Sequence, residues 1–371
     1  MANLNNTDSL NAVLVRLAFF ILPIIISLAI SALLVIAVDR DPMEVSQLIW
    51  EGAFRNQRSQ AGVLNLFITL VLVSIGLIVT FRAGLWNIGV EGQMMMGAVF
   101  ASIIPMAFLQ NESLDPAAFP QPLIVGGSIL LAMFGGILWA TLVGILKIYL
   151  GINEIFGGVA LNALANVGAI YLISGPWEPD IGGSAQGTAP FPKETHIPQI
   201  SSEFPTSLLM LVICAVAFIV VTFMLTRTRW GLSLKANGLN DRSALLLGVA
   251  TDRIGMSAFW VCGALAGIAG SYRALFTFDS LRPLASGGIG FLGLLVVLLV
   301  SIRIIWVPLV AFIFAAILSG STRLRISLQL DSSLASVLQG TLVLLVLLSN
   351  GARDAWFRRR NTTQPDQSGE I

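Results

Sequence analysis

The sequence predicts an all-α protein that crosses a membrane about ten times, with some of its helices broken or re-entrant. Of its 371 residues 56% are hydrophobic and only 11% are charged, and the mean hydropathy is +0.86, which is too apolar for one soluble core. The apolar residues form long unbroken runs, whereas the strands of a membrane barrel alternate apolar and polar residues. Such runs satisfy their backbone groups in lipid by forming helices.

The predicted spans approach the roughly 20 apolar residues that a helix needs to cross the hydrocarbon core. In chain order they are 17–38, 62–80, 94–109, 122–146, 155–174, 207–226, 256–276, 288–302, 305–320 and 334–349. The spans that begin at Met94 and Gly288 follow glycine-rich stretches and are candidates for discontinuous helices. The first span lacks a clean cleavage site before Asp39 and is expected to stay as an anchor. We therefore expect one membrane domain over 17–350, between tails 1–16 and 351–371.

Basic residues predict the side that each loop faces, because cytoplasmic loops are enriched in Lys and Arg. With both termini inside, the inner loops and tails collect 13 of the 21 basic residues. Five of these lie in a loop at about 227–256 and four in the tail 351–371. The longest outer loop, at about 175–205, is rich in Pro and Gly, and 39–61 is a candidate for a short amphipathic helix on the outer surface.

The composition and the motifs argue against several classes of function. The net charge of +1 gives no reason to expect a nucleic-acid partner, and the single histidine, His196, cannot form a metal cluster. Cys214 and Cys262 both lie in apolar runs, where a cysteine is usually a small buried hydrophobe. The sequence contains no G-x-x-x-x-G-K-[ST] phosphate-binding loop and no constellation of His, Ser and carboxylate residues for catalysis. We expect neither an enzyme nor an ATP-binding subunit.

The stretch "FRAGLWNIGVEGQMMMGA", residues 81–98, places polar side chains and glycines between two apolar runs. One interpretation is a cytoplasmic turn, with Asn87 capping the next helix and Glu91 in its first turn. The other is a broken element at membrane depth that borders a translocation path, where polar groups are costly unless they serve it. Under the second interpretation Asn87, Glu91 and Gln93 are candidate path residues.

Two further stretches carry polar residues in unusual places. Within residues 151–172, Asn162 and Asn166 are four positions apart and so share one helix face, which must meet either another helix or a polar path. The loop 227–253 contains apolar residues at helical spacing over 241–249, with Asn240 as a candidate cap. This short amphipathic helix is expected to dock on the protein's own helices or lipid headgroups, or on a soluble partner.

Together these stretches resemble bacterial ABC-transporter permeases of the branched-chain amino acid, ribose and nucleoside uptake group. Residues 81–98 look like the signature F-x-A-G-x-x-N-I-G-x-E-G-Q-x-x-x-G-A, and "GINEIFGGVALNALA" is similar to the G-x-N-E-V-I-x-x-x-x-L-N segment of the nucleoside and simple-sugar branch. "GLNDRSALLLGV" resembles the coupling-loop pattern G-x-N-x-x-A-A-x-x-x-G-I, with Ser243 and Val249 as mild departures. Residues 295–308 depart clearly from the family pattern. The resemblance covers about residues 60–350.

The resemblance implies a permease subunit of an ATP-driven importer in the bacterial cytoplasmic (inner) membrane. Two permeases, related or identical, would form the pore, cytoplasmic ATPases would bind ATP and Mg, and an extracytoplasmic binding protein would deliver the solute. No cofactor is expected in this chain. A nucleoside fits this branch best and a simple sugar next; the alternatives are a branched-chain amino acid permease and an ion-coupled secondary transporter. The implied ATPase-coupling residues are Gly238, Asn240, Asp241, Ala244, Leu245 and Gly248, with Leu246 as a further apolar contact. The candidate residues of the solute path are Asn87, Glu91, Gln93, Asn162 and Asn166.

Overall fold

The computed structural model describes residues 39–111, 113–179 and 186–328, with short pieces within 25–37 and 337–348. The described residues are helical or irregular, and no strand occurs among them. The chain forms two compact units, one of residues 54–319 and one of residues 1–53 with 320–371. The predicted tails 1–16 and 351–371 and most of the predicted span 334–349 lie outside the described residues.

The unit 54–319 contains most of the long helices. In chain order they are α3 (Gln57–Arg82), α4 (Val90–Ala101), α5 (Ile103–Gln110), α6 (Gln121–Ile148), α7 (Glu154–Ile173), α8 (Leu208–Arg227), α9 (Arg229–Leu239), α10 (Asp241–Leu246), α11 (Thr251–Tyr272) and α12 (Ile289–Leu299). A π-helix, η3 (Arg273–Thr277), continues α11. Short 3₁₀ helices occur at Pro116–Ala118, Lys193–Thr195 and Ile304–Trp306, and α13 (Val307–Leu328) begins in this unit.

Seven helices among the described residues are long and apolar enough to cross a membrane. They are 57–82, 90–110, 121–148, 154–173, 208–227, 251–277 and 304–324, and each corresponds to one predicted span. The predicted span 288–302 corresponds to α12, which has 11 residues and is shorter than the roughly 20 needed for a crossing. The predicted span 17–38 is described only in short pieces. The structure therefore supports a polytopic helical protein without confirming the count of ten.

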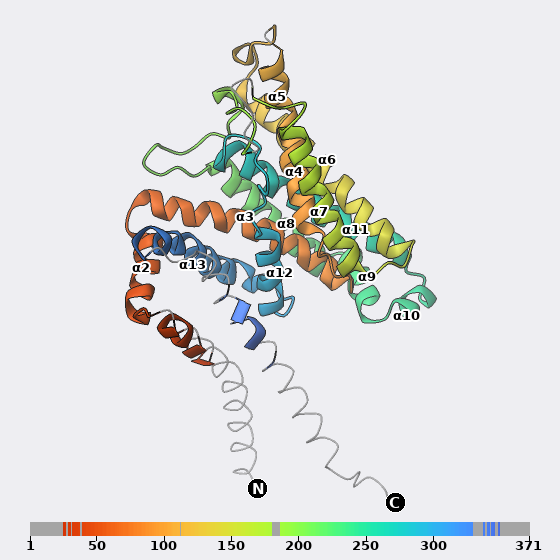
Figure 1. Ribbon diagram of the computed structural model, residues 1–371. Helices are drawn as coiled ribbons and strands as arrows, with labels where there is room; N and C mark the ends of the chain where they lie inside the picture. Colours follow the sequence, from red (N-terminus) through yellow and green to blue (C-terminus); the bar gives the residue numbers. More distant parts are fainter. Residues whose placement is uncertain are drawn as a thin grey trace, which may run out of the picture. The chain divides into compact units, whose positions relative to one another are not determined.

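Small residues allow three of the helices to pack with their backbones in close contact, as they do in many membrane helix pairs. A Cβ added to Gly97 on α4 would lie 2.4 Å from the Cα of Gly267 on α11, and one added to Gly136 on α6 would lie 2.0 Å from the carbonyl oxygen of Gly263. The span of α3 and that of α11 are each 72% buried, whereas that of α8 is 22% buried. α4, α6, α7 and α11 lie side by side in Figure 1, and together with α3 they form the core of this unit.

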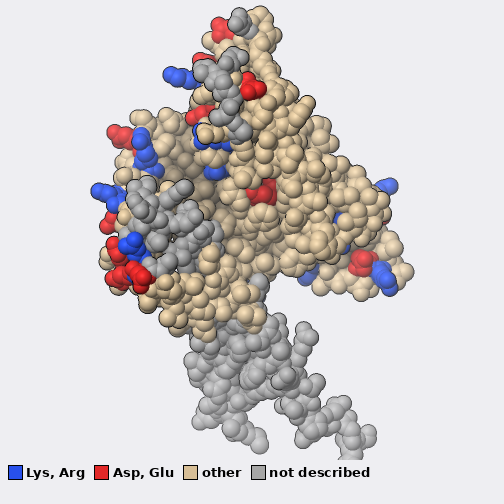
Figure 2. All heavy atoms as spheres, viewed as in Figure 1, with Lys and Arg blue, Asp and Glu red and all other residues tan. Residues whose placement is uncertain are grey.

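The face of the molecule shown in Figure 2 carries few charges over these packed helices. Lys, Arg, Asp and Glu gather instead near α9 and α10, at the opposite end around the connections beyond α5, and along the left edge of this view. A wide uncharged surface between two charged ends is what a membrane-spanning bundle requires, because ionised side chains are costly in the hydrocarbon core.

In the unit of 1–53 and 320–371, α2 (Pro42–Phe54) packs closely on the part of α13 that follows residue 319. A Cβ on Gly52 would lie 2.4 Å from the carbonyl oxygen of Gly320. An ion pair joins Glu51 to Arg323 at 3.2 Å, and Val35, Val45 and Leu324 form a buried cluster. The predicted amphipathic helix within 39–61 thus corresponds to α2.

Candidate functional site

The chain between α3 and α4, residues 83–89, is not helical, and its Ala83, Asn87 and Gly89 are buried; we call it the first broken segment. The side-chain amide of Asn87 lies 3.1 Å from the Sγ atom of Cys262, which is at the middle of α11. A Cβ on Gly76, which is within α3, would also contact Cys262. The first broken segment therefore reaches from the end of α3 back to the middle of the neighbouring helices.

Two neutral side chains, Asn87 of this segment and Gln93 of α4, hydrogen-bond to each other. The Nδ2 atom of Asn87 donates to the Oε1 atom of Gln93 at 3.1 Å, and the Nε2 atom of Gln93 donates to the Oδ1 atom of Asn87 at 3.0 Å. Both side chains are fully buried. Their hydrogen bonds offset the cost of burying two amides among apolar helices.

Asn162 on α7 connects the chain on both sides of the start of α4. Its Oδ1 atom accepts a hydrogen bond from the backbone N–H of Gly92 at 2.8 Å, and its Nδ2 atom donates to the carbonyl oxygen of Ile88 at 2.9 Å. Gly92 has no room for a side chain, because a Cβ would lie 2.8 Å from Trp139 and 2.9 Å from Asn162. Asn162 thus pairs backbone groups that the broken helix leaves without helical partners.

A second broken segment, residues 278–288, connects η3 to α12. Its backbone has positive φ at Asp279 (49°) and Leu284 (54°), and at Gly287 and Gly288. Non-glycine residues in this region are strained, and such strain is concentrated at functional sites. Asn166, one helical turn beyond Asn162 on α7, accepts a hydrogen bond from the backbone N–H of Leu284 at 2.9 Å. One face of α7 therefore holds both broken segments.

Glu91 joins α4 to the N-terminus of α12. Its two carboxylate oxygens accept hydrogen bonds from the backbone N–H groups of Gly288 and Gly290, each at 2.7 Å. The N-terminus of a helix carries a partial positive charge and free N–H groups, so a carboxylate stabilises it. Arg273 of η3 donates to the carbonyl oxygen of Ala285 at 3.0 Å and attracts Glu91 electrostatically. These two charged residues hold the second broken segment near its C-terminal end, where α12 begins.

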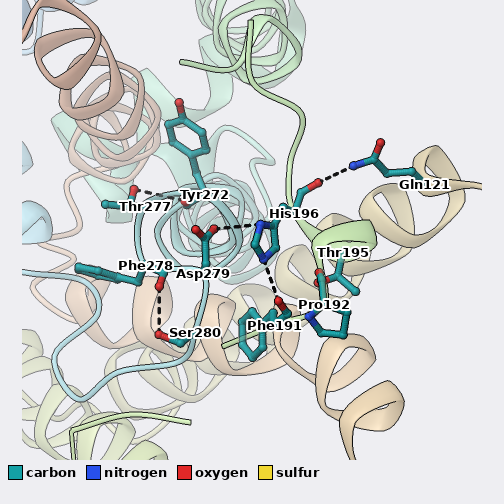
Figure 3. Close-up of polar contacts among 10 residues, drawn as sticks. All are labelled: Gln121, Phe191, Pro192, Thr195, His196, Tyr272, Thr277, Phe278, Asp279 and Ser280. Carbon is teal, nitrogen blue, oxygen red and sulfur yellow. Dashed lines mark hydrogen bonds and ion pairs between the residues drawn. The ribbon is translucent and has the colours of Figure 1, made fainter. Parts of the chain in front are cut away.

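A loop of residues 186–207 holds the other end of the second broken segment, as Figure 3 shows. Backbone hydrogen bonds run from Thr188 to Leu281, from Phe191 to Asp279 and from Ile197 to Leu275. His196 lies between two partners in this view: its Nε2 atom is 3.0 Å from the carbonyl oxygen of Phe191, and its Nδ1 atom is 3.6 Å from the carboxylate of Asp279. Gln121, at the start of α6, donates to the carbonyl oxygen of His196 at 3.0 Å.

The electrostatics at Asp279 are mixed. Burial raises the pKa of its carboxyl above the ordinary 3.8, while the positive charges of His196 and Arg282 act in the opposite direction. His196 and Asp279 are far apart in the chain, and no short motif contains both. The only signal in the sequence for this contact is that the chain has a single histidine. The role of the 186–207 loop was therefore not predicted.

At the opposite end of α11, α10 presents an apolar surface formed by Leu245, Leu246 and Leu247, which are 61%, 89% and 82% exposed; we call it the leucine ridge. Asn240 caps α10 by accepting a hydrogen bond from the N–H of Ser243 at 2.9 Å. Ala244 is buried, and Gly248 follows the helix with a φ of 84°. Asp241 accepts a hydrogen bond from the N–H of Arg242. The predicted amphipathic helix is present, whereas the preceding α9 was not predicted.

Gly238 connects this end of the molecule to the first broken segment. A Cβ on Gly238 would lie 2.3 Å from the carbonyl oxygen of Arg82, and the neighbouring Asn237 donates to the carbonyl oxygen of Ala83 at 3.0 Å. A cavity of about 420 Å³ lies between the two regions and is lined by residues that include Gly84, Asn237 and Asp241. A displacement of α10 would therefore reach the end of α3 through Asn237 and Gly238 of α9.

Comparison with known proteins gives one family and several relatives of similar length. A family model described as "Branched-chain amino acid transport system / permease component" matches residues 59–347. A glucose ABC transporter permease protein of Haloferax volcanii is 25% identical over 363 residues, covering 94% of this chain and 93% of the relative. A guanosine ABC transporter permease protein of Bacillus subtilis is 26% identical over 344 residues, covering 91% and 96%.

A nucleoside ABC transporter permease protein of Lactococcus lactis is 23% identical over 313 residues, covering 81% of this chain and 82% of the relative. No solved structure matches the chain. The family match includes both broken segments and the leucine ridge, and it extends over more than half of the 371 residues. The chain therefore belongs to the family of branched-chain amino acid transport system permease components.

Proposed function

We propose that this chain is the permease subunit of an ATP-driven importer that depends on a binding protein, and that it forms half of a pore for a nucleoside or a simple sugar. The names of the relatives, which are glucose, guanosine and nucleoside permeases, support this solute class. The observation that carries the proposal is the leucine ridge on α10, at one end of a membrane-spanning bundle. Three adjacent leucines with high exposure are typical of a surface that another protein covers.

The partner proposed for the leucine ridge is the cytoplasmic ATPase, which binds ATP and Mg. Asn240 and Gly248 define the ends of α10, the buried Ala244 anchors it, and Leu245 and Leu246 are available for contact. Asp241 lies in its first turn. Gly238 passes movement to the end of α3, because no side chain separates the two backbones. ATP binding and hydrolysis in the partner would thus alternate the pore between inward-open and outward-open states.

This assignment sets the orientation of the chain in the bacterial inner membrane. If α10 faces the cytoplasm, the 186–207 loop faces outward, because α11 and η3 cross the membrane once between them. That side is where a binding protein would deliver the solute. The second permease of the pore, a related or an identical chain, completes the path.

The solute path is proposed to follow the two broken segments. Irregular backbone at membrane depth is tolerated where protein covers it or where it lines a water-filled cavity. Leu284 in the second segment is 64% exposed in this chain, and Asn162 and Asn166 beside the segments are half-buried. Neutral amides on such a path suit a hydroxyl-rich solute without charge. The path role of Asn87, Glu91, Gln93, Asn162 and Asn166 stays a prediction.

Co-purification of the assembled transporter tests the proposal. Leu246→Asp places a charge on the leucine ridge, and we expect it to abolish co-purification with the ATPase and to abolish uptake, while the chain still accumulates in the membrane. The matched control is Leu114→Asp, the same change at an exposed leucine in the connection after α5. It should retain the ATPase.

Two results would contradict the proposal. The first is normal ATPase binding and uptake by the Leu246→Asp variant. The second is accumulation of solute by the purified chain alone, in vesicles with only a proton or sodium gradient, which would indicate a secondary transporter. Gly238 is a poor site for such a test, because any side chain there would collide with Arg82 inside the same chain.

A further inference from the structure

Glu91 is a charged residue whose contacts were not expected from its position. It lies in the first turn of α4, yet its carboxylate is bound to the N–H groups of Gly288 and Gly290 at the start of α12. Both the carboxylate and the backbone of Glu91 lie close to Gly290. A Cβ on Gly290 would lie 2.4 Å from a carboxylate oxygen of Glu91 and 2.9 Å from its Cα atom. Glu91 is only 8% exposed in this chain. The geometry fits a structural contact between α4 and α12.

α12 depends on this contact more than a spanning helix would. It has 11 residues, or about 16 Å at 1.5 Å per residue, which is too short for a crossing, and its first residues, Ile289 and Gly290, are buried. Its body packs on α3, where Gly293 faces Val73 and Leu77. Its start follows the strained second broken segment, and there the hydrogen bonds to Glu91 add to the packing of the buried Ile289 and Gly290.

The charges around this start are balanced within the chain. Glu91 faces the partial positive charge of the helix N-terminus and is attracted to Arg273. The Arg273 guanidinium lies over the ring of Phe278, 4.5 Å from its centroid, and binds the carbonyl oxygen of Ala285. The carboxylate is therefore satisfied by the protein itself and has no need of a solute.

We propose that Glu91 is a positioning residue that fixes the N-terminus of α12 and thereby the position of this half-helix along the path. It acts on transport through α12 and not by contact with the solute. The inference deepens the proposed function, on which its transport arm rests. The first measurement that tests it does not involve transport, so the positioning role of Glu91 and the proposed transport function can be contradicted separately.

The first measurement is the reactivity of a cysteine in the second broken segment. Ser286, two residues before Gly288, is 2% exposed, and Ser286→Cys changes its size little. The reagent is a small, water-soluble, cationic thiosulfonate applied to membranes that contain the full transporter. The parent chain, with its buried Cys214 and Cys262, gives the background.

We expect Glu91→Gln to increase the labelling rate of Ser286→Cys by about tenfold, because a glutamine keeps the shape but loses the charge and one of the two acceptors. Glu91→Asp keeps the charge on a side chain shorter by one methylene and should give an intermediate rate. The matched control is Glu178→Gln, the same change at an exposed glutamate on the 175–179 connection. It should leave the labelling rate unchanged.

The transport arm separates positioning from solute contact. If Glu91 acts through α12, Glu91→Gln should lower the maximal uptake rate while the solute concentration for half-maximal uptake stays within about twofold. An unchanged labelling rate in Glu91→Gln would overturn the proposal, whether or not uptake is altered. Should Glu91→Gln fail to accumulate in the membrane, the Glu91→Asp variant decides by the same criterion, since an unchanged labelling rate there also overturns it.

Discussion

The two broken segments are held in place by different kinds of contact. The first, 83–89, is closed by neutral amides, namely the Asn87–Gln93 pair and Asn162, and Gly84 is its only residue with positive φ. The second, 278–288, has four such residues, and besides the amide of Asn166 it is held by Glu91, by Arg273 and by the 186–207 loop. The first segment is therefore a fixed connection, whereas the second combines strain with charge.

This difference indicates which part of the path depends most on its contacts. Buried neutral hydrogen bonds are costly to break one at a time, because each leaves an unsatisfied group in an apolar surrounding. A strained backbone persists only where the surrounding structure determines it, so the second segment depends on the contacts that hold it. We infer that the first segment keeps α3, α4 and α7 together, whereas the positions of the second segment and of α12 depend on Glu91, Arg273 and the 186–207 loop.

The largest effect is expected at Gly92, in the first turn of α4 beside the first segment, where there is no room for a side chain. Gly92→Val would place methyl groups against Trp139 and Asn162, and we expect it to lower the free energy of unfolding by about 3 kcal/mol or more, through overpacking and the loss of the Asn162 hydrogen bond. The measurement is the midpoint of thermal unfolding of the purified protein in detergent.

Gly168 on α7 provides the control for this prediction, because nothing lies within 4 Å of a Cβ added there. Gly168→Val tests the same change on a helix of the same bundle without the collision, and it should unfold near the wild-type midpoint. Equal midpoints for the two variants would show that the first segment adjusts easily, and the contrast between the segments would then be wrong.

A smaller effect is expected from the two asparagines of α7, which compare the segments directly. Asn162→Leu leaves the N–H of Gly92 and the carbonyl of Ile88 without partners, so we expect it to cost about 2–3 kcal/mol of stability. Asn166→Leu leaves only the N–H of Leu284 unpaired, on an exposed residue, so its cost should stay below about 1 kcal/mol. Uptake should nevertheless fall in Asn166→Leu, because the second segment loses its attachment to α7.

Thermal unfolding and uptake, measured on both variants in parallel, check this prediction. The distinction fails if Asn166→Leu destabilises the protein as much as Asn162→Leu does. It also fails if Asn166→Leu transports normally.

The sequence predicted the features that depend on local pattern. Hydropathy located the seven long helices, since each is a continuous apolar run, and the four-residue spacing of Asn162 and Asn166 placed them on one face. Asn240 indicated the start of α10 as a capping residue. These signals lie within a few residues of the feature that they predict.

The remaining features depend on contacts between distant parts of the chain. Glu91 and Gly288 are 197 positions apart, and His196 meets Asp279 only because the 186–207 loop folds over the end of α11. Hydropathy also overestimated the length of α12, because the apolar run continues through residues where the backbone turns away, with φ of 50° at Ser301 and 62° at Ile302. A sequence pattern reports burial, but it does not report which buried groups pair.

The smallest expected effect is at Asp279, where the 186–207 loop holds the second segment. Burial raises the pKa of this carboxyl, so the folded protein binds the proton more tightly than the unfolded chain does. A group of this kind contributes its stability below the unfolded pKa and loses it as the pH rises through the raised value. We expect this loss to lower the midpoint of thermal unfolding of the wild type slightly as the pH rises from about 4. The Asp279→Asn variant has no carboxyl at this position that could titrate, and it should not show this decrease.

The measurement is the difference between the two unfolding midpoints at pH values from about 4 to 7, with Asp115→Asn, at an exposed aspartate beyond α5, as the control that should follow the wild type. The sign of the difference decides between two forces at the same carboxyl. If the wild type instead gains stability relative to Asp279→Asn as the pH rises, attraction to His196 and Arg282 outweighs burial, and the 186–207 loop is then held by charge in the same way as α12. A difference that does not change with pH would show that Asp279 holds the loop through its backbone alone, since the carbonyl oxygen of Asp279 already accepts a hydrogen bond from Phe191.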